Sequence, residues 1–164
     1  MKIELKKLNA LQHAVLPFSE VIDLKDEKMY GRNPFQSPVY VEGEVSNESG
    51  VLRLKGSIKT VYSTECARCL KPLDIPLEAE ADMILSDDPE AEEEDDLFVL
   101  TGDSVDPADV LVPALILQVQ MTYLCKEDCK GLCPHCGADR NEVECDCDKK
   151  QSDPRFAALR ALLD

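Results

Sequence analysis

The chain has 164 residues, enough for one modest hydrophobic core, and its 18 basic and 33 acidic side chains give a formal net charge of −15. The acidity is local, since residues 76–123 contain 14 acidic and no basic side chains. This balance disfavours a basic stripe that neutralises phosphates and favours a basic protein partner. No stretch approaches the roughly 18 apolar residues that cross a bilayer. Residues 1–23 lack the apolar core of a signal peptide, so we expect a cytoplasmic protein.

Alternating apolar and polar residues predict strands in much of the chain. Residues 9–29 are ambiguous, and we interpret them as a loop with a short helix. The sequence Asn47-Glu-Ser-Gly50 is typical of a hairpin turn, and Gly56 is expected to form a β-bulge. The predicted strands cover residues 2–8, 39–45, 51–62, 73–85 and 97–100.

Residues 87–96 form an acidic run, which is typical of a solvated loop; a docking segment for a basic partner is the alternative. The pair Asp106-Pro107 joins an N-cap to a proline at the first helical position, which predicts a helix over about 107–121. Pro113 should kink this helix or shift its start. Asp153-Pro154 predicts a second, short helix over 155–163 in the same way.

These elements predict an α+β fold, in which an antiparallel β meander or partial barrel is accompanied by one long helix. We expect a β-rich domain over residues 1–123. Residues 124–164 should form a cysteine-rich, zinc-ribbon-like segment that ends in the short terminal helix.

The eight cysteines are the strongest chemical signal in the sequence. In a reducing compartment such a pattern indicates metal binding or redox chemistry more than disulfides. Zinc in structural sites takes four soft donors in a tetrahedron, so four close pairs of cysteines supply enough ligands for one or two zinc ions. The four pairs are Cys66 and Cys69, Cys125 and Cys129, Cys133 and Cys136, and Cys145 and Cys147.

Spacing does not decide which pairs share an ion. The preferred partition puts the pair Cys66 and Cys69 with the pair Cys125 and Cys129, and leaves the last four cysteines to the second site. In the alternative, Cys66 and Cys69 share an ion with Cys133 and Cys136. Cys125 and Cys129 are expected on one face of a helical turn, and His135 is a less favoured substitute ligand.

The sequence favours a binding protein over an enzyme. Cys133-Pro-His-Cys136 also occurs as the motif of some thiol oxidoreductases, but those place it where a strand enters a helix, and here more cysteines flank it. No nucleophile–histidine–acid order and no phosphate-binding glycine loop is present. We therefore predict no catalytic residues and no small-molecule substrate.

The cysteines stand in three longer motifs: Cys66-Ala-Arg-Cys69-Leu-Lys-Pro72, Cys125-Lys-Glu-Asp-Cys129-Lys-Gly-Leu-Cys133-Pro-His-Cys136-Gly, and Asn141-Glu142 followed by Cys145-Asp-Cys147. The chain then continues to the C-terminal residues Asp153-Pro-Arg-Phe-Ala-Ala-Leu. Together these motifs resemble those of the YceD family, the large ribosomal RNA subunit accumulation proteins of bacteria and plastids, and the resemblance covers nearly the whole chain.

The resemblance implies a non-enzymatic factor for the synthesis, processing or stability of large-subunit (23S) ribosomal RNA. The implied partner is a ribosomal or RNA-processing protein or a precursor of the large subunit, and direct contact with RNA stays open. Arg68, inside the first motif, is the candidate contact residue; balancing the thiolate charge is its alternative role. A thiol-redox or metal-responsive regulator and a generic zinc-stapled interaction module are the alternative functions.

Overall fold

The computed structural model describes residues 1–9, 13–88 and 96–147. Most of the acidic run and the predicted helix over 155–163 lie outside the described residues. The chain divides into two compact units, and each is described by itself. The first unit contains Met1–Glu65 and Pro72–Tyr123, and the second contains Cys66–Lys71 and the residues from Leu124 onward.

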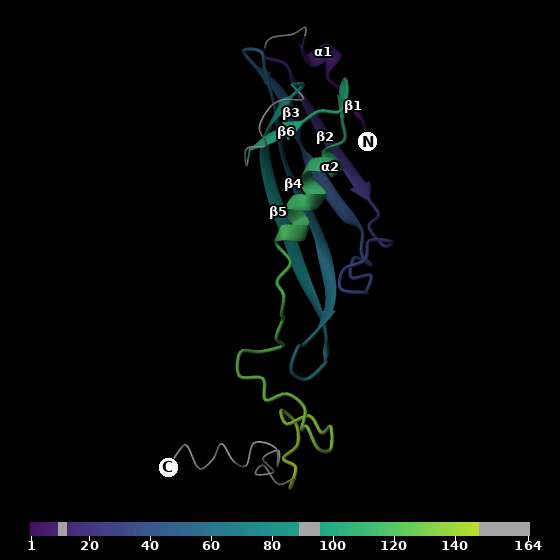
Figure 1. Ribbon diagram of the computed structural model, residues 1–164, viewed down its shortest axis with the longest axis vertical. Coiled ribbons are helices and arrows are strands. Elements are labelled where there is room, and N and C mark those ends of the chain that lie inside the picture. Colours follow the sequence, from purple (N-terminus) through teal and green to yellow (C-terminus); the bar gives the residue numbers. More distant parts are fainter. Residues whose placement is uncertain (10–12, 89–95, 148–164) are drawn as a thin grey trace, which may run out of the picture. The chain divides into compact units, whose positions relative to one another are not determined.

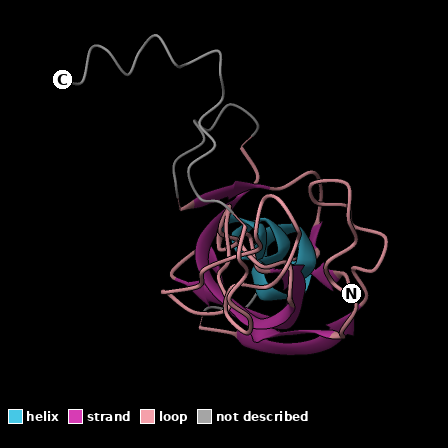
Figure 2. Cartoon of the chain, turned by 90° about the horizontal axis from the view of Figure 1, so that it is seen from below, coloured by secondary structure: helices cyan, strands magenta, loops and turns pink. Residues whose placement is uncertain are grey.

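The first unit is mostly β-structure, built on a curled sheet of five strands in the order β2-β3-β4-β5-β6 (Figure 1). Neighbouring strands from β2 to β5 are antiparallel, as in the predicted meander, whereas β6 runs parallel to β5. The sheet forms half of a barrel around a single long helix, α2 (Figure 2). Its strands are β2 (Val15–Ile22), β3 (Val39–Glu48), β4 (Val51–Glu65), β5 (Pro72–Ser86) and β6 (Leu97–Val99).

Two predictions for the N-terminal part were wrong. In place of a strand over 2–8, only β1 (Ile3–Glu4) is extended, paired with β7 (Ser104–Val105), and α1 (Lys6–Asn9) follows it. Leu5 and Leu8 are both buried, and a spacing of three residues places both on one side of a helical turn but on opposite faces of a strand. The loop expected over 9–29 contains β2, an edge strand that pairs with β3 along its whole length.

The predicted hairpin between β3 and β4 is confirmed. Its turn residues Ser49 and Gly50 both have positive φ, 58° and 95°, which suits the twist of a two-residue hairpin. The Asn47 side chain accepts a hydrogen bond from the Gly50 N–H and donates one to the Leu8 carbonyl. The bulge expected at Gly56 is absent, because Gly56 pairs in unbroken register with both neighbouring strands.

Helix α2 (Pro107–Leu117) begins where the sequence predicted, with Asp106 accepting a hydrogen bond from the Ala108 N–H. It ends one turn before residue 121, and Pro113 lies inside it. Leu117 is 83% exposed and Met121 89% exposed, so neither side chain belongs to the core. Among the described residues, no helix is long and apolar enough to span a membrane.

A row of small residues shapes the inner face of the sheet. Phe18, Gly43, Gly56 and Ala81 are direct neighbours across four strands, from β2 to β5. The Phe18 ring fills the space left by the two glycines, and Leu111 of α2 packs over Gly56. The Phe18 ring, helix α2 and the strand backbones therefore approach one another closely because these two glycines have no side chain.

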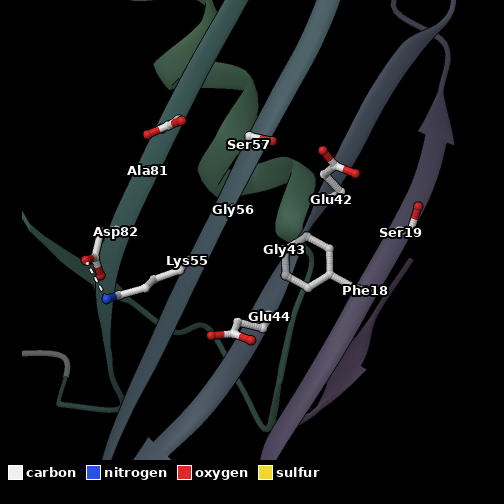
Figure 3. A pocket seen from close by; sticks show the side chains of 11 residues that line it. Phe18, Ser19, Glu42, Gly43, Glu44, Lys55, Gly56, Ser57, Ala81 and Asp82 are labelled. Carbon is white, nitrogen blue, oxygen red and sulfur yellow. Dashed lines mark ion pairs between the residues drawn. The ribbon is translucent and has the colours of Figure 1, made fainter.

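The opposite face at this row carries polar side chains around a shallow hollow of about 750 Å³ (Figure 3). Charges here pair across strands: Asp82 lies 3.3 Å from Lys55 and 3.3 Å from Arg53. Lys59 makes a 2.9 Å ion pair with Glu78. Basic groups of β4 thus offset acidic groups of β5 along this face.

The close packing at the glycine row gives a stability prediction. In Gly43→Ala the new methyl group would clash with the backbone carbonyl oxygen of Lys55 and would lie 2.7 Å from the Phe18 ring. We expect the free energy of unfolding to fall by about 1–3 kcal/mol, the usual effect of overpacking, in urea unfolding followed by circular dichroism. Gly102→Ala is the control, since nothing lies within 4 Å of its added carbon. Equal unfolding curves for the two variants would contradict this account of the sheet.

Candidate metal centre

The structure gathers the eight cysteines into two clusters, both within the second unit. All are free thiols, and the four sulfurs of each cluster lie within 4.8 Å of one another. This is the preferred partition, and among the described residues the donors of both clusters are cysteines only. The first cluster is Cys66, Cys69, Cys125 and Cys129; the second is Cys133, Cys136, Cys145 and Cys147.

The first cluster begins at the turn that joins β4 to β5. Here Cys66–Lys71 forms a tight knuckle, in which the Cys66 N–H donates to the Lys71 carbonyl over 2.8 Å. The Leu70 N–H donates to the Cys66 carbonyl over 2.9 Å. Leu70 closes the turn with a φ of 60°, a left-handed conformation that is unfavourable for a residue with a side chain.

The second cluster begins with a knuckle of the same design. The Cys133 N–H donates to the Ala138 carbonyl over 2.8 Å, and the Gly137 N–H donates to the Cys133 carbonyl over 2.9 Å. Gly137 has a φ of 73° and occupies the position that Leu70 occupies in the first knuckle. Two different sequences thus fold into one turn, and the shared pattern comes from the Cys-x-x-Cys spacing.

The first sulfur of each knuckle accepts hydrogen bonds from backbone N–H groups. The pKa of the Cys133 thiol is lowered to about 6, chiefly by hydrogen bonds from the backbone N–H groups of Cys136 and His135. Burial raises the pKa of the Cys66 thiol, but backbone N–H groups led by that of Cys125 outweigh it and lower the pKa to about 6. These sulfurs are therefore prepared as thiolates, the form that binds metals.

The sulfurs of Cys147 and Cys125 ionise less easily without a cation. The pKa of the Cys147 thiol is raised to about 12, first by its hydrogen bond with Cys136 and then by burial. Desolvation and the neighbouring sulfurs likewise raise the pKa of the Cys125 thiol to about 12. Four thiolates at this distance repel one another, and a divalent cation between them would remove that repulsion.

The spacing of the sulfurs fits tetrahedral zinc. Four sulfurs placed 2.3 Å from a central ion lie about 3.8 Å from one another. In the first cluster the sulfurs of Cys66 and Cys129 are 3.8 Å apart, and those of Cys69 and Cys125 are 3.6 Å apart. An all-thiolate set is soft, which selects zinc or a similar metal over magnesium or calcium. Both clusters could hold such an ion, one per cluster.

The second pair of each cluster is built differently from the knuckles. The sequence suggested that Cys125 and Cys129 share a helical turn, and this prediction was wrong. The two residues flank a bend in which the Cys129 N–H donates to the Lys126 carbonyl. Cys145 and Cys147 follow in a segment without regular structure. Each cluster thus joins one knuckle to one irregular pair, and the zinc-ribbon-like form stays a prediction.

Arg68 serves the first cluster from inside the knuckle. Its guanidinium donates to the Cys129 carbonyl over 2.8 Å and to the Glu127 carbonyl over 3.4 Å. Its own carbonyl accepts a hydrogen bond from the Leu132 N–H. The side chain therefore holds the Cys125–Cys129 loop against the knuckle, while contact with a partner stays a prediction.

The spacing of the cysteines assigns no role to four polar residues that join the clusters. Lys71 makes ion pairs with Glu142 over 2.7 Å and with Asp139 over 3.3 Å. Asn141 donates from its amide nitrogen to the Cys129 sulfur over 3.4 Å. Asn141 and Glu142 belong to the motif that carries the family resemblance, but spacing could not show that they reach the other cluster.

The fold and the clusters define a protein with a β half-barrel and a two-cluster cysteine module. The chain belongs to the YceD family: the family model described as "Large ribosomal RNA subunit accumulation protein YceD" matches residues 54–163. This confirms the family that the cysteine motifs predicted. The match covers all eight cysteines.

Relatives differ in length and in what their names say. A chloroplastic protein of Arabidopsis thaliana, "Large ribosomal RNA subunit accumulation protein YCED homolog 1", is 26% identical over 84% of this chain and 51% of its own length. "Uncharacterized protein YlbN" of Bacillus subtilis is 26% identical over 99% of this chain and 96% of its own length. The chain thus spans about half of the plant relative and nearly all of the bacterial one. No solved structure matches it.

The two knuckles have the same turn but a different closing residue, which gives a stability prediction for each of them. Gly137→Ala should destabilise the second unit by roughly 1 kcal/mol, because a left-handed residue gains a side chain while nothing within 4 Å obstructs it. Leu70→Gly should leave the stability unchanged or raise it by up to roughly 1 kcal/mol, since the Leu70 side chain is 57% exposed. Chemical unfolding of the purified chain measures both. Destabilisation by Leu70→Gly beyond that of Gly137→Ala would show that the Leu70 side chain has a packing role.

Proposed function

We propose that this chain is a non-enzymatic, zinc-binding factor that supports the accumulation of large-subunit ribosomal RNA. The observation that carries the proposal is the family match, which spans β5, α2 and the whole cysteine module. The Arabidopsis relative is named for the accumulation of the large ribosomal RNA subunit. The geometry of the two clusters supports zinc as the cofactor.

Binding, not catalysis, is the mode of action that the clusters support. Catalytic zinc keeps an open position for water or substrate, whereas four thiolates complete a tetrahedral shell. Zinc in these sites would hold the knuckles and the segments between them in place. A partner would then bind the surfaces that zinc holds in place, including the exposed side of the first knuckle.

The charge of the chain points to the kind of partner. Its net charge of −15 makes close approach to RNA phosphates unfavourable and attracts basic proteins. We therefore propose a basic ribosomal or RNA-processing protein, alone or within a precursor of the large subunit, in the cytoplasm where bacterial ribosomes assemble. The effect on RNA would then pass through that protein.

The cellular role is tested by depleting this protein. We expect a lower ratio of large- to small-subunit ribosomal RNA, with fewer large subunits on a sucrose gradient, restored by the wild-type gene. A variant with Cys66→Ser and Cys69→Ser should fail to restore the ratio, because the first knuckle loses its ligands. An unchanged ratio after depletion would rule out the proposed function. A ratio that falls only under oxidative stress would favour the thiol-redox alternative.

Metal content is tested on the purified chain by elemental analysis. We expect two zinc ions per chain, and one after Cys133→Ser with Cys136→Ser, because each cluster takes its own ion. His135→Ser is the matched control within the same knuckle, and it should keep both ions, since the four donors of that cluster are cysteines. A chain without metal would refute the zinc proposal, and loss of an ion in His135→Ser would refute the ligand set.

A further inference from the structure

Residues 139–142 lie in the sequence between two cysteines of the second cluster, but their side chains contact residues at the first cluster. Those two cysteines are Cys136 and Cys145. From this segment the Asn141 amide nitrogen donates to the sulfur of Cys129, in the first cluster, over 3.4 Å. The Asn141 amide oxygen accepts the backbone N–H of Lys130 over 2.8 Å. One side chain thus binds both the sulfur and the backbone next to it.

The orientation of Asn141 is fixed from its own segment. One oxygen of Asp139 accepts both the backbone N–H of Asn141, over 2.9 Å, and its amide nitrogen, over 2.6 Å. The other oxygen of Asp139 faces Lys71, the last residue of the first knuckle. The amide nitrogen is therefore turned toward Cys129, with no freedom to flip.

The second cluster sets the ends of this segment. Cys136 precedes it and Cys145 follows it, so a metal ion on the second cluster would close residues 137–144 into a short loop. Without that ion the same residues would be ordered only by their hydrogen bonds and by the ion pairs to Lys71, at a larger cost in conformational entropy. An ion on the second cluster would therefore hold Asn141 more firmly in its position at the first.

We propose that Asn141 is a positioning residue for the metal ion of the first cluster, and that occupation of the second cluster raises the metal affinity of the first through it. The inference rests on the zinc binding proposed above. Zinc with four thiolates carries a net charge of −2, and an N–H donor to a sulfur stabilises that charge. Partners of metal ligands typically contribute 10–100-fold in affinity.

The test uses the full-length chain and titrates it with zinc against a competing chelator. Asn141→Leu has nearly the same size but no donor, and we expect it to weaken the first site about 10–100-fold. Val143→Ala is the control, because this side chain is exposed and lies two residues away in the sequence, and it should leave both affinities unchanged. With cobalt in place of zinc, loss of the N–H···S bond should also move the sulfur-to-metal charge-transfer band of the first site to longer wavelength, which a purely structural role would not do.

The coupling is tested with a second pair of changes. Cys133→Ser with Cys136→Ser disables the second cluster, and the first site should then bind zinc at least about tenfold more weakly. In the Asn141→Leu background the same pair of changes should cause little further loss, because the contact from this segment to the Cys129 sulfur is already gone. Two bound ions with a first site that responds to neither change would overturn the inference and leave the zinc proposal intact. A wild-type chain that binds no zinc would overturn both.

Discussion

The pairing of β4 with β5 is the constraint on which the rest of the structure depends. Its unbroken register, from Leu52 opposite Leu85 to Glu65 opposite Pro72, fixes which face of each strand is buried. Because side chains alternate, a slip of one residue would turn Leu54 and Ile58 out of the core. The same register ends at Glu65 and Pro72, so the pairing that forms the core also brings together the two ends of the segment that contains Cys66 and Cys69.

The two knuckles have the same backbone turn, although only one of them has a glycine at the left-handed position that closes it. Glycine closes the second knuckle without strain, whereas Leu70 closes the first in a left-handed conformation that costs roughly 1–2 kcal/mol. Strain of this kind persists only where the surroundings impose it. Here the surroundings are the hydrogen bond from Leu70 to Cys66 and the strand ends on either side. The turn is thus dictated by the placement of two sulfurs more than by the residue that closes it.

What the sequence could reveal was local. Alternation found β3, β4 and β5, and Asp106-Pro107 located the start of α2, because each signal lies within a few residues. Strand β2 was missed because it is a half-exposed edge strand containing Pro17, with only one fully buried side chain, Phe18. Two features could not be read from local patterns. One is the parallel pairing of β6 with β5, and the other is the contact of Asn141 with Cys129, which joins the segment of one cluster to a sulfur of the other.

The family match begins at Leu54, inside β4, and so leaves out β1 to β3. The matched part nevertheless cannot complete its own core: Gly56 leaves a gap that the ring of Phe18, from β2, fills beneath Leu111. The N-terminal strands therefore meet a packing requirement, whereas the matched part carries the thiol chemistry. The part of the chain that the family model matches thus contains both clusters, and it depends on Phe18 of β2 for its packing.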